Sequence, residues 1–136
     1  MEKVIIEVAR TEQGYSAACS LLPAWVVAVS GNFDDLQREV KESIDFYIDC
    51  AKEDGDKYPS VFDKEYELQY QFDIQSLLYF YQNIFSFASL QNLTGINQKQ
   101  LSHYAAGRSK PRKEQAEKIM KGFHKLAEDL YKLLVL

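Results

Sequence analysis

TGINQKQLSHYAAGRSKPR, at residues 94–112, is the stretch that decides how the C-terminal half of this chain folds. Gly95 is placed to end one short helix, because glycine tolerates the left-handed backbone of a tight turn. Ile96 is apolar and is expected to fill that turn, and Asn97 is a favourable N-cap for the next helix. This next helix has one apolar face, formed at i, i+3 and i+4 by Leu101, Tyr104 and Ala105.

The other face of that helix and the loop after it are polar and basic. We expect one set to enter a major groove and read base edges: Gln98, Lys99, Gln100 and His103. We expect a second set to bind phosphates: Ser102, Arg108, Lys110, Arg112 and Lys113. Helix, glycine turn, polar helix and basic loop together predict a helix-turn-helix that binds double-stranded DNA. The alternative is a helical hairpin with an ordinary solvated face; the joint occurrence of turn, cap and basic loop argues against it.

This stretch resembles the lambda-repressor-like (Cro/cI, Xre-type) helix-turn-helix. The family pattern runs glycine, aliphatic, small polar cap, Gln, aliphatic, Ser, glycine and a Lys/Arg-Pro loop. It is matched in order by Gly95, Ile96, Asn97, Gln98, Leu101, Ser102, Gly107, Lys110 and Pro111. Gln91 departs from the pattern, because the family usually has a small alanine there, packed against the second helix.

Composition is that of an ordinary globular protein. The 136 residues are 46% hydrophobic and 26% charged, with room for one medium domain or two small ones. The longest apolar run, residues 24–29, is too short to span a bilayer, and the N-terminus leads into a strand pattern, not a secretion signal. Cys19 and Cys50 lack metal-ligand spacing and are expected to be reduced thiols of a cytoplasmic protein.

The net charge of −4 conceals a polarity along the chain. Residues 1–64 hold 7 Lys and Arg against 13 Asp and Glu, which gives −6. Residues 97–125 hold 8 basic and 2 acidic side chains, which gives +6. An acidic half joined to a basic half suggests two different partners, and the basic block coincides with the predicted helix-turn-helix.

Residues 1–72 predict the element order β-β-β-α-β. Three short strands, at 3–9, 15–20 and 25–29, indicate an antiparallel meander, and the third is expected to be central because it is apolar nearly throughout. Asn32 and Asp35 form a capping box at the start of a helix. The helix has an apolar stripe of Leu36, Val40, Ile44, Tyr47, Ile48 and Ala51. A polar linker leads to a strand at 66–72 with one buried face, and helical spacing resumes from residue 73.

This first region resembles HicB-type antitoxins of bacterial toxin–antitoxin pairs. The matching motifs are GYSA at 14–17, Leu22-Pro23, SGNFDD at 30–35 and KESIDFYI at 41–48. The family usually shows Gly-Tyr-x-Ala, a Pro-x-Leu-Pro-Gly turn, a threonine cap and Lys-Glu-Ala-Ile-x-x-Tyr. This chain has Asn32 at the cap, Ser43 in place of alanine, and Ala24-Trp25 where glycine and cysteine are common.

The two resemblances imply an α+β protein of two domains. Residues 1–72 would be a degenerate RNase H-like domain without catalysis that masks a small basic HicA-like toxin, which cleaves RNA. Residues 73–136 would bind the operator DNA of the protein's own operon as a homodimer or higher even oligomer, without a cofactor. Leu126, Leu130, Leu133 and Leu134, with strand 66–72, are the candidate seams. Expected toxin contacts are the most apolar turn and nearby acidic residues: Leu21, Leu22, Trp25, Asp34, Asp35 and Glu39.

Two alternatives belong to other classes. The first is a stand-alone Xre-type regulator whose N-terminal domain oligomerises or senses a ligand. The second is a nuclease that uses the RNase H-like half. Asp35, Glu39 and Glu42 share one helix face and could in principle hold a divalent metal. No histidine, glycine loop or second acidic cluster supports such a site, so neither catalysis nor a metal is expected.

Overall fold

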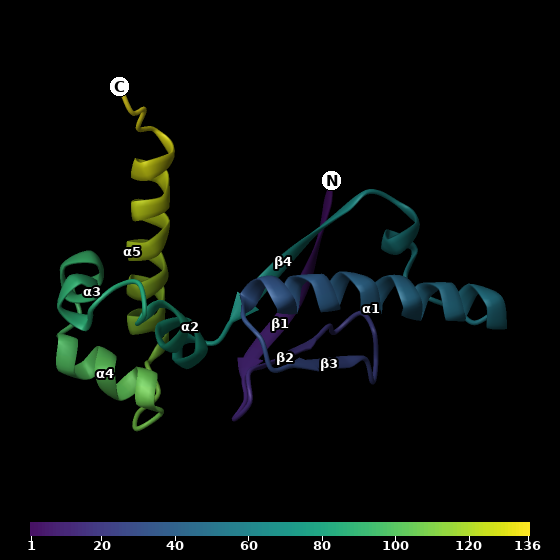
Figure 1. Ribbon diagram of the computed structural model, residues 1–136, viewed down its shortest axis with the longest axis horizontal. Coiled ribbons are helices and arrows are strands. Elements are labelled where there is room, and N and C mark those ends of the chain that lie inside the picture. The colour runs from purple at the N-terminus through teal and green to yellow at the C-terminus, as the bar shows by residue number, and fades with distance from the viewer. The chain divides into compact units, whose positions relative to one another are not determined.

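The computed structural model describes all residues, 1–136, and divides the chain into two units, Met1–Asp73 and Ile74–Leu136. The first unit contains β1 (Glu2–Arg10), β2 (Tyr15–Ala18), β3 (Val26–Val29), α1 (Phe33–Asp54), a 3-10 helix η1 (Ser60–Asp63) and β4 (Tyr66–Phe72) (Figure 1). The second unit contains only helices: α2 (Ile74–Tyr81), α3 (Phe87–Thr94), α4 (Gln98–Ala106) and α5 (Lys113–Tyr131). The α+β class is therefore confirmed, and the division falls one residue beyond the predicted boundary.

The sheet of the first unit has the strand order β3-β2-β1-β4. β1, β2 and β3 form the predicted antiparallel meander, and β4 returns after α1 to pair in parallel with β1. The prediction that the third strand is central is wrong. β3 lies at one edge, where Val26 is 65% exposed. The two interior strands are β2 and β1, because β4 adds to the free side of β1.

One face of this sheet packs against α1. Alternate residues of β1 point inward, namely Val4, Ile6 and Val8, all at most 3% exposed. The α1 stripe of Leu36, Val40, Ile44, Ile48 and Ala51 is buried against this sheet, while Tyr47 is half-buried. The predicted capping box is confirmed, because Asp35 and Asn32 each accept a hydrogen bond from the other's backbone N–H.

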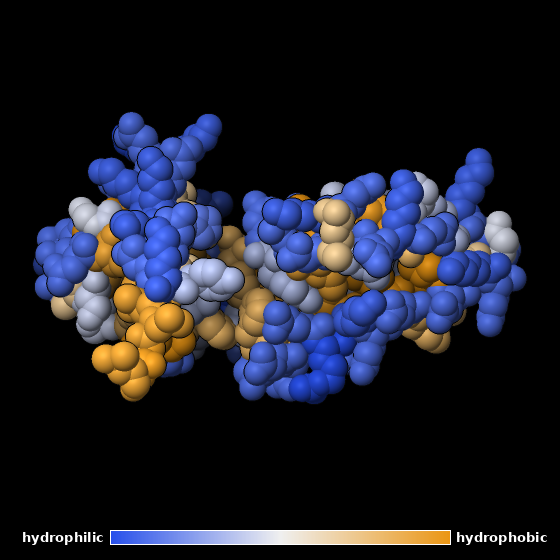
Figure 2. All heavy atoms as spheres, turned by 90° about the horizontal axis from the view of Figure 1, so that it is seen from above, coloured by the Kyte–Doolittle hydropathy of each residue, from blue (hydrophilic) through white to orange (hydrophobic).

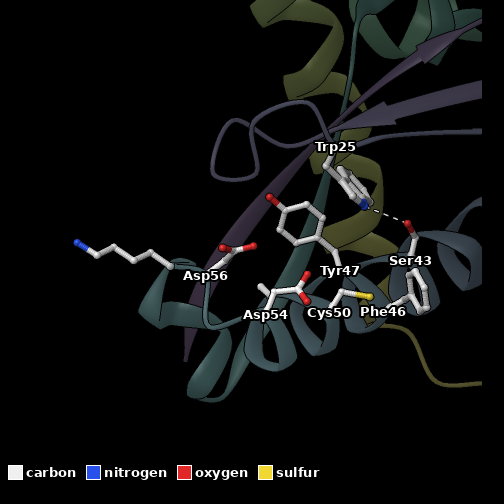
Figure 3. A pocket seen from close by; sticks show the side chains of 9 residues that line it. Trp25, Ser43, Phe46, Tyr47, Cys50, Asp54 and Asp56 are labelled. Atoms are coloured by element: carbon white, nitrogen blue, oxygen red, sulfur yellow. Dashed lines mark hydrogen bonds between the residues drawn. The ribbon is translucent and has the colours of Figure 1, made fainter.

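The turn between β2 and β3 is folded inward. Leu22 and Trp25 are buried, and the Trp25 N–H donates to the Leu22 carbonyl at 3.1 Å. Ala24 adopts a φ of 66°, the left-handed conformation that favours glycine. The Trp25 indole Nε1–H donates to the Ser43 Oγ of α1 at 3.0 Å (Figure 3). Two departures from the HicB-type pattern, Trp25 and Ser43, therefore contact each other.

We expect Ser43→Ala to lower the free energy of unfolding by about 1–3 kcal/mol, because it leaves a mostly buried indole N–H without an acceptor. Denaturant unfolding followed by circular dichroism measures the loss. Trp25→Phe is the partner substitution for a double-mutant cycle. An unchanged effect of Ser43→Ala in the Trp25→Phe background would show that the hydrogen bond is not its cause.

The second unit is a small helical core. Its buried apolar side chains come from all four helices and one turn: Leu77, Leu78, Leu90, Ile96, Leu101, Tyr104, Ala105 and Ile119. Phe123 of α5 adds aromatic contacts, with its ring centroid 5.3 Å from Tyr81 and 6.1 Å from Phe85. Gly122 lets α5 approach α3, since a Cβ there would lie 2.7 Å from the Leu93 carbonyl oxygen.

The end of α5 and the residues after it are apolar and exposed. Leu130 is 57% exposed, Leu133 67% and Leu134 96%. In Figure 2 apolar side chains project from the C-terminal unit at the left of the view. These leucines therefore contribute little to the core of their own unit.

No helix of this chain combines the length and the apolarity that crossing a bilayer requires.

Candidate nucleic-acid interface

The turn between α3 and α4 has the predicted geometry. Gly95 adopts a φ of 76° and its N–H donates to the Gln91 carbonyl at 2.9 Å, which ends α3. The Ile96 side chain is 4% exposed and fills the turn, as expected. Buried Thr94 stabilises the same turn, because its Oγ1 donates to the Leu90 carbonyl and accepts from the Ile96 N–H. The orientation of α4 against α3 is therefore fixed by backbone and core contacts together.

Two side chains cap the first turn of α4. The Asn97 Oδ1 accepts from the Lys99 N–H at 2.8 Å, so the predicted N-cap is confirmed. The Gln91 Oε1 reaches across from α3 and accepts from the Gln98 N–H, also at 2.8 Å. Gln91, noted in the sequence as a departure from alanine, thus joins the two helices by a hydrogen bond where alanine could make none. The sequence pattern did not predict this role of Gln91, because the donor and the acceptor lie on different helices.

We expect Gln91→Ala to destabilise the second unit by about 0.5–2 kcal/mol, the usual loss for a helix N-cap. Gln91→Glu is the matched control, because a carboxylate still accepts the hydrogen bond and suits the positive end of the helix dipole. Thermal unfolding followed by circular dichroism should show a lower melting temperature for the alanine variant alone. Equal melting temperatures for Gln91→Ala and the parent chain would contradict this role.

The four side chains predicted to read bases differ in availability. Gln98 and Lys99 are exposed at the N-terminal end of α4, and His103 is half-buried. Gln100 is also half-buried, and its Nε2 donates to the Ser109 Oγ at 3.2 Å in the loop after α4. The structure thus leaves Gln98 and Lys99 free for a ligand and ties Gln100 to the loop, an interaction that the sequence pattern did not reveal.

The end of α4 and the following loop present cations. Gly107 adopts a φ of 77°, and the Arg108 N–H donates back to the His103 carbonyl at 3.0 Å, which closes the helix. Four of the predicted phosphate contacts, Arg108, Lys110, Arg112 and Lys113, are exposed, while Ser102 on α4 is half-buried. None of these four cations forms an ion pair. They are therefore available to an external anion.

The charge polarity follows the boundary between the units. Residues 1–73 hold 7 Lys and Arg against 16 Asp and Glu, which gives −9. Residues 74–136 hold 9 basic and 4 acidic side chains, which gives +5. Each unit thus has one predominant sign of charge, and the two signs are opposite. Two partners of opposite charge would each meet one complementary unit.

Two of the predicted toxin contacts are buried in the core of the first unit. Leu22 is 2% and Trp25 6% exposed, so both belong to the core, whereas Leu21 is 42% exposed. Asp34 and Glu39 are exposed on α1. Asp35 caps α1 and pairs with Arg38 at 3.3 Å. A partner can therefore reach Leu21, Asp34 and Glu39, and also Asp35, whose side chain is 42% exposed but already engaged with Arg38 and the helix cap.

No group of three or more His, Cys, Asp or Glu side chains is placed to hold a metal ion. Asp35, which could have joined Glu39 and Glu42 in such a group, is occupied by its cap and by Arg38. Both cysteines are free thiols, Cys19 buried and Cys50 half-buried.

Comparisons with protein-family models, curated proteins and solved structures find no match for this chain.

Proposed function

We propose that the chain is an antitoxin of a type II toxin–antitoxin pair and the repressor of its own operon. The second unit would be a lambda-repressor-like helix-turn-helix with α4 as its recognition helix. The observation that carries this part is the doubly capped α4, with Gln98 and Lys99 exposed at its start and four unpaired cations after its end. Side chains at the start of such a helix read bases, and cations beyond it bind phosphates.

The first unit would be a degenerate RNase H-like domain that masks a small basic toxin. Its charge of −9 supports this role, because complementary charges speed association between partners.

A homodimer or higher even oligomer would place two recognition helices on a two-fold operator. β4 at the sheet edge and the exposed Leu130, Leu133 and Leu134 are available as seams. Light scattering at micromolar concentration tests this, and a strictly monomeric mass would overturn it.

The function is tested with the full chain and two probes. The first is the duplex upstream of its own reading frame, compared with a scrambled duplex of the same length. The second is the small basic protein encoded beside it, tested for growth arrest and for rescue by this chain. Specific DNA binding with rescue supports the proposal. Specific DNA binding without rescue leaves the stand-alone Xre-type regulator, and metal-dependent RNA cleavage by the pure chain would establish the nuclease.

We expect Lys110→Ala to weaken binding to all DNA sequences alike, because a loop lysine neutralises a phosphate and does not reach a base. The slope of log affinity against log salt concentration should become shallower by about one unit. Lys132→Ala, an exposed lysine beyond the end of α5, is the control and should leave the slope unchanged. A loss confined to one sequence, at constant slope, would contradict the phosphate role of Lys110.

A further inference from the structure

A hollow of about 290 Å³ lies beside the second half of α1. Figure 3 shows its wall of aromatic and acidic side chains, which come from the turn before β3, from α1 and from the segment that follows it. The lining residues that matter here are Trp25, Ser43, Phe46, Tyr47, Asp54 and Asp56. All of them belong to the first unit.

The inner wall of the hollow is held in place before any ligand arrives. Trp25 is 6% exposed and its indole is fixed by the hydrogen bond to Ser43. Phe46, in contrast, is 71% exposed, although most apolar side chains of α1 face the sheet. A large aromatic side chain at the edge of a preformed hollow can serve as an interface anchor when a partner covers it.

The charges beside the hollow select the sign of its ligand. Two other carboxylates of α1 are already neutralised, Asp35 by Arg38 and Asp45 by Lys41, whose pKa is raised chiefly by its hydrogen bond to Asp45. Asp54 and Asp56 form no ion pair, although Lys57 also lines the hollow. Aromatic faces combined with free carboxylates favour a cation, and a planar guanidinium can both stack on a ring and bind a carboxylate through two hydrogen bonds.

We propose that this hollow receives an arginine side chain of a basic protein partner. The inference deepens the proposed function and rests on it for the identity of the partner. The centre of the expected contact surface also shifts from the turn before β3 to α1. Leu22 and Trp25 in that turn are buried, whereas Phe46 on α1 is exposed and can be reached.

The arginine site itself can be tested without the partner. The chain contains a single tryptophan, so the Trp25 indole N–H gives one signal in a nitrogen-correlated NMR spectrum. The full chain is titrated with N-acetyl-arginine amide and, in parallel, with N-acetyl-citrulline amide, which has the same shape without the charge. We expect a saturable shift of the Trp25 indole signal with the arginine probe only. Equal shifts with both probes, or no saturable shift, would overturn the proposal.

Two charge-matched variants locate the effect. Asp54→Asn with Asp56→Asn removes both carboxylates of the hollow, and we expect it to weaken binding of the arginine probe by roughly fivefold. Glu12→Gln with Glu65→Gln removes the same number of charges from exposed positions of the first unit that do not line the hollow. This control should bind the probe as the parent does. Equal losses in the two variants would mean that only the net charge matters, and would refute the site.

The neighbouring basic protein then separates this inference from the proposed function. If that protein binds, Phe46→Ala should weaken the complex roughly tenfold or more, as expected for an interface anchor. Binding that is unaffected by Phe46→Ala and by the Asp54→Asn, Asp56→Asn variant would refute the hollow and leave the antitoxin function standing. If that protein does not bind at all, the proposed function fails, and the arginine titration still decides whether the hollow is a cation site.

Discussion

Gly14→Ala is expected to destabilise the first unit by about 3 kcal/mol, at the upper end of the range for forced overpacking. A Cβ at this position would lie 2.1 Å from the Val29 carbonyl oxygen and 2.9 Å from the Ser30 Cα. Both are backbone atoms at the end of β3, so no side-chain rotation can relieve the clash. The pairing of β2 with β3 would have to open, and with it the turn that seats Trp25. Denaturant unfolding followed by the fluorescence of Trp25 measures the loss.

Gly55→Ala is the control for this experiment. Gly55 ends α1 with a φ of 70° and has nothing within 4 Å of its would-be Cβ. Its replacement carries the left-handed backbone penalty of about 1–2 kcal/mol, partly offset by the reduced freedom of the unfolded chain. Gly14→Ala should therefore be clearly the more destabilising of the two. If the two substitutions cost the same, the close approach of Gly14 to β3 does not constrain the fold.

Gln98→Ala is expected to weaken binding to the specific operator by about 1–3 kcal/mol, roughly fivefold to 150-fold, and to relax specificity at one base pair. Gln98 is exposed at the start of α4, and its backbone N–H is already satisfied by Gln91. Its side-chain amide makes no hydrogen bond within the chain, so it can pair with a base edge. Competition binding to operator duplexes substituted at one position at a time measures both the affinity and the specificity.

Gln100→Ala should have the smaller effect of the two. The Gln100 amide must first release the Ser109 hydroxyl before it can contact DNA, so part of any gain on binding is offset. Both variants remove the same side-chain chemistry from the same helix, which makes the comparison direct. A larger loss for Gln100→Ala, or unchanged specificity for Gln98→Ala, would reverse the assignment of the base-reading residue.

The two proposed binding sites lie on different units and carry opposite charges. Cations of the second unit are free of ion pairs around α4, and free carboxylates of the first unit border the hollow on α1. Substitutions on α1 such as Asp54→Asn should therefore leave DNA binding unchanged, while Lys110→Ala should leave the arginine titration unchanged. Each ligand is opposite in charge to the unit that binds it. Salt should therefore weaken both associations by screening.

Local signals in the sequence determined much of the fold. Gly95, Gly107 and the cap at Asn97 fixed the turn and both ends of α4, because these features act on backbone groups within a few residues. Asn32 and Asp35 likewise fixed the start of α1. Alternation at residues 66–72 predicted β4 with its observed bounds, since period-two burial is a property of the strand itself.

Only the tertiary structure decided what those elements lie against. Hydrophobic periodicity shows which side of a strand is buried but not its neighbours, so the edge position of β3 depended on β4 joining β1. Three side-chain hydrogen bonds join residues 7, 9 and 18 positions apart: Gln91 with Gln98, Gln100 with Ser109, and Trp25 with Ser43. Packing brings such groups together, and no spacing rule within one helix or strand predicts them. The hollow beside Phe46 exists for the same reason, because its walls come from separate segments of the chain.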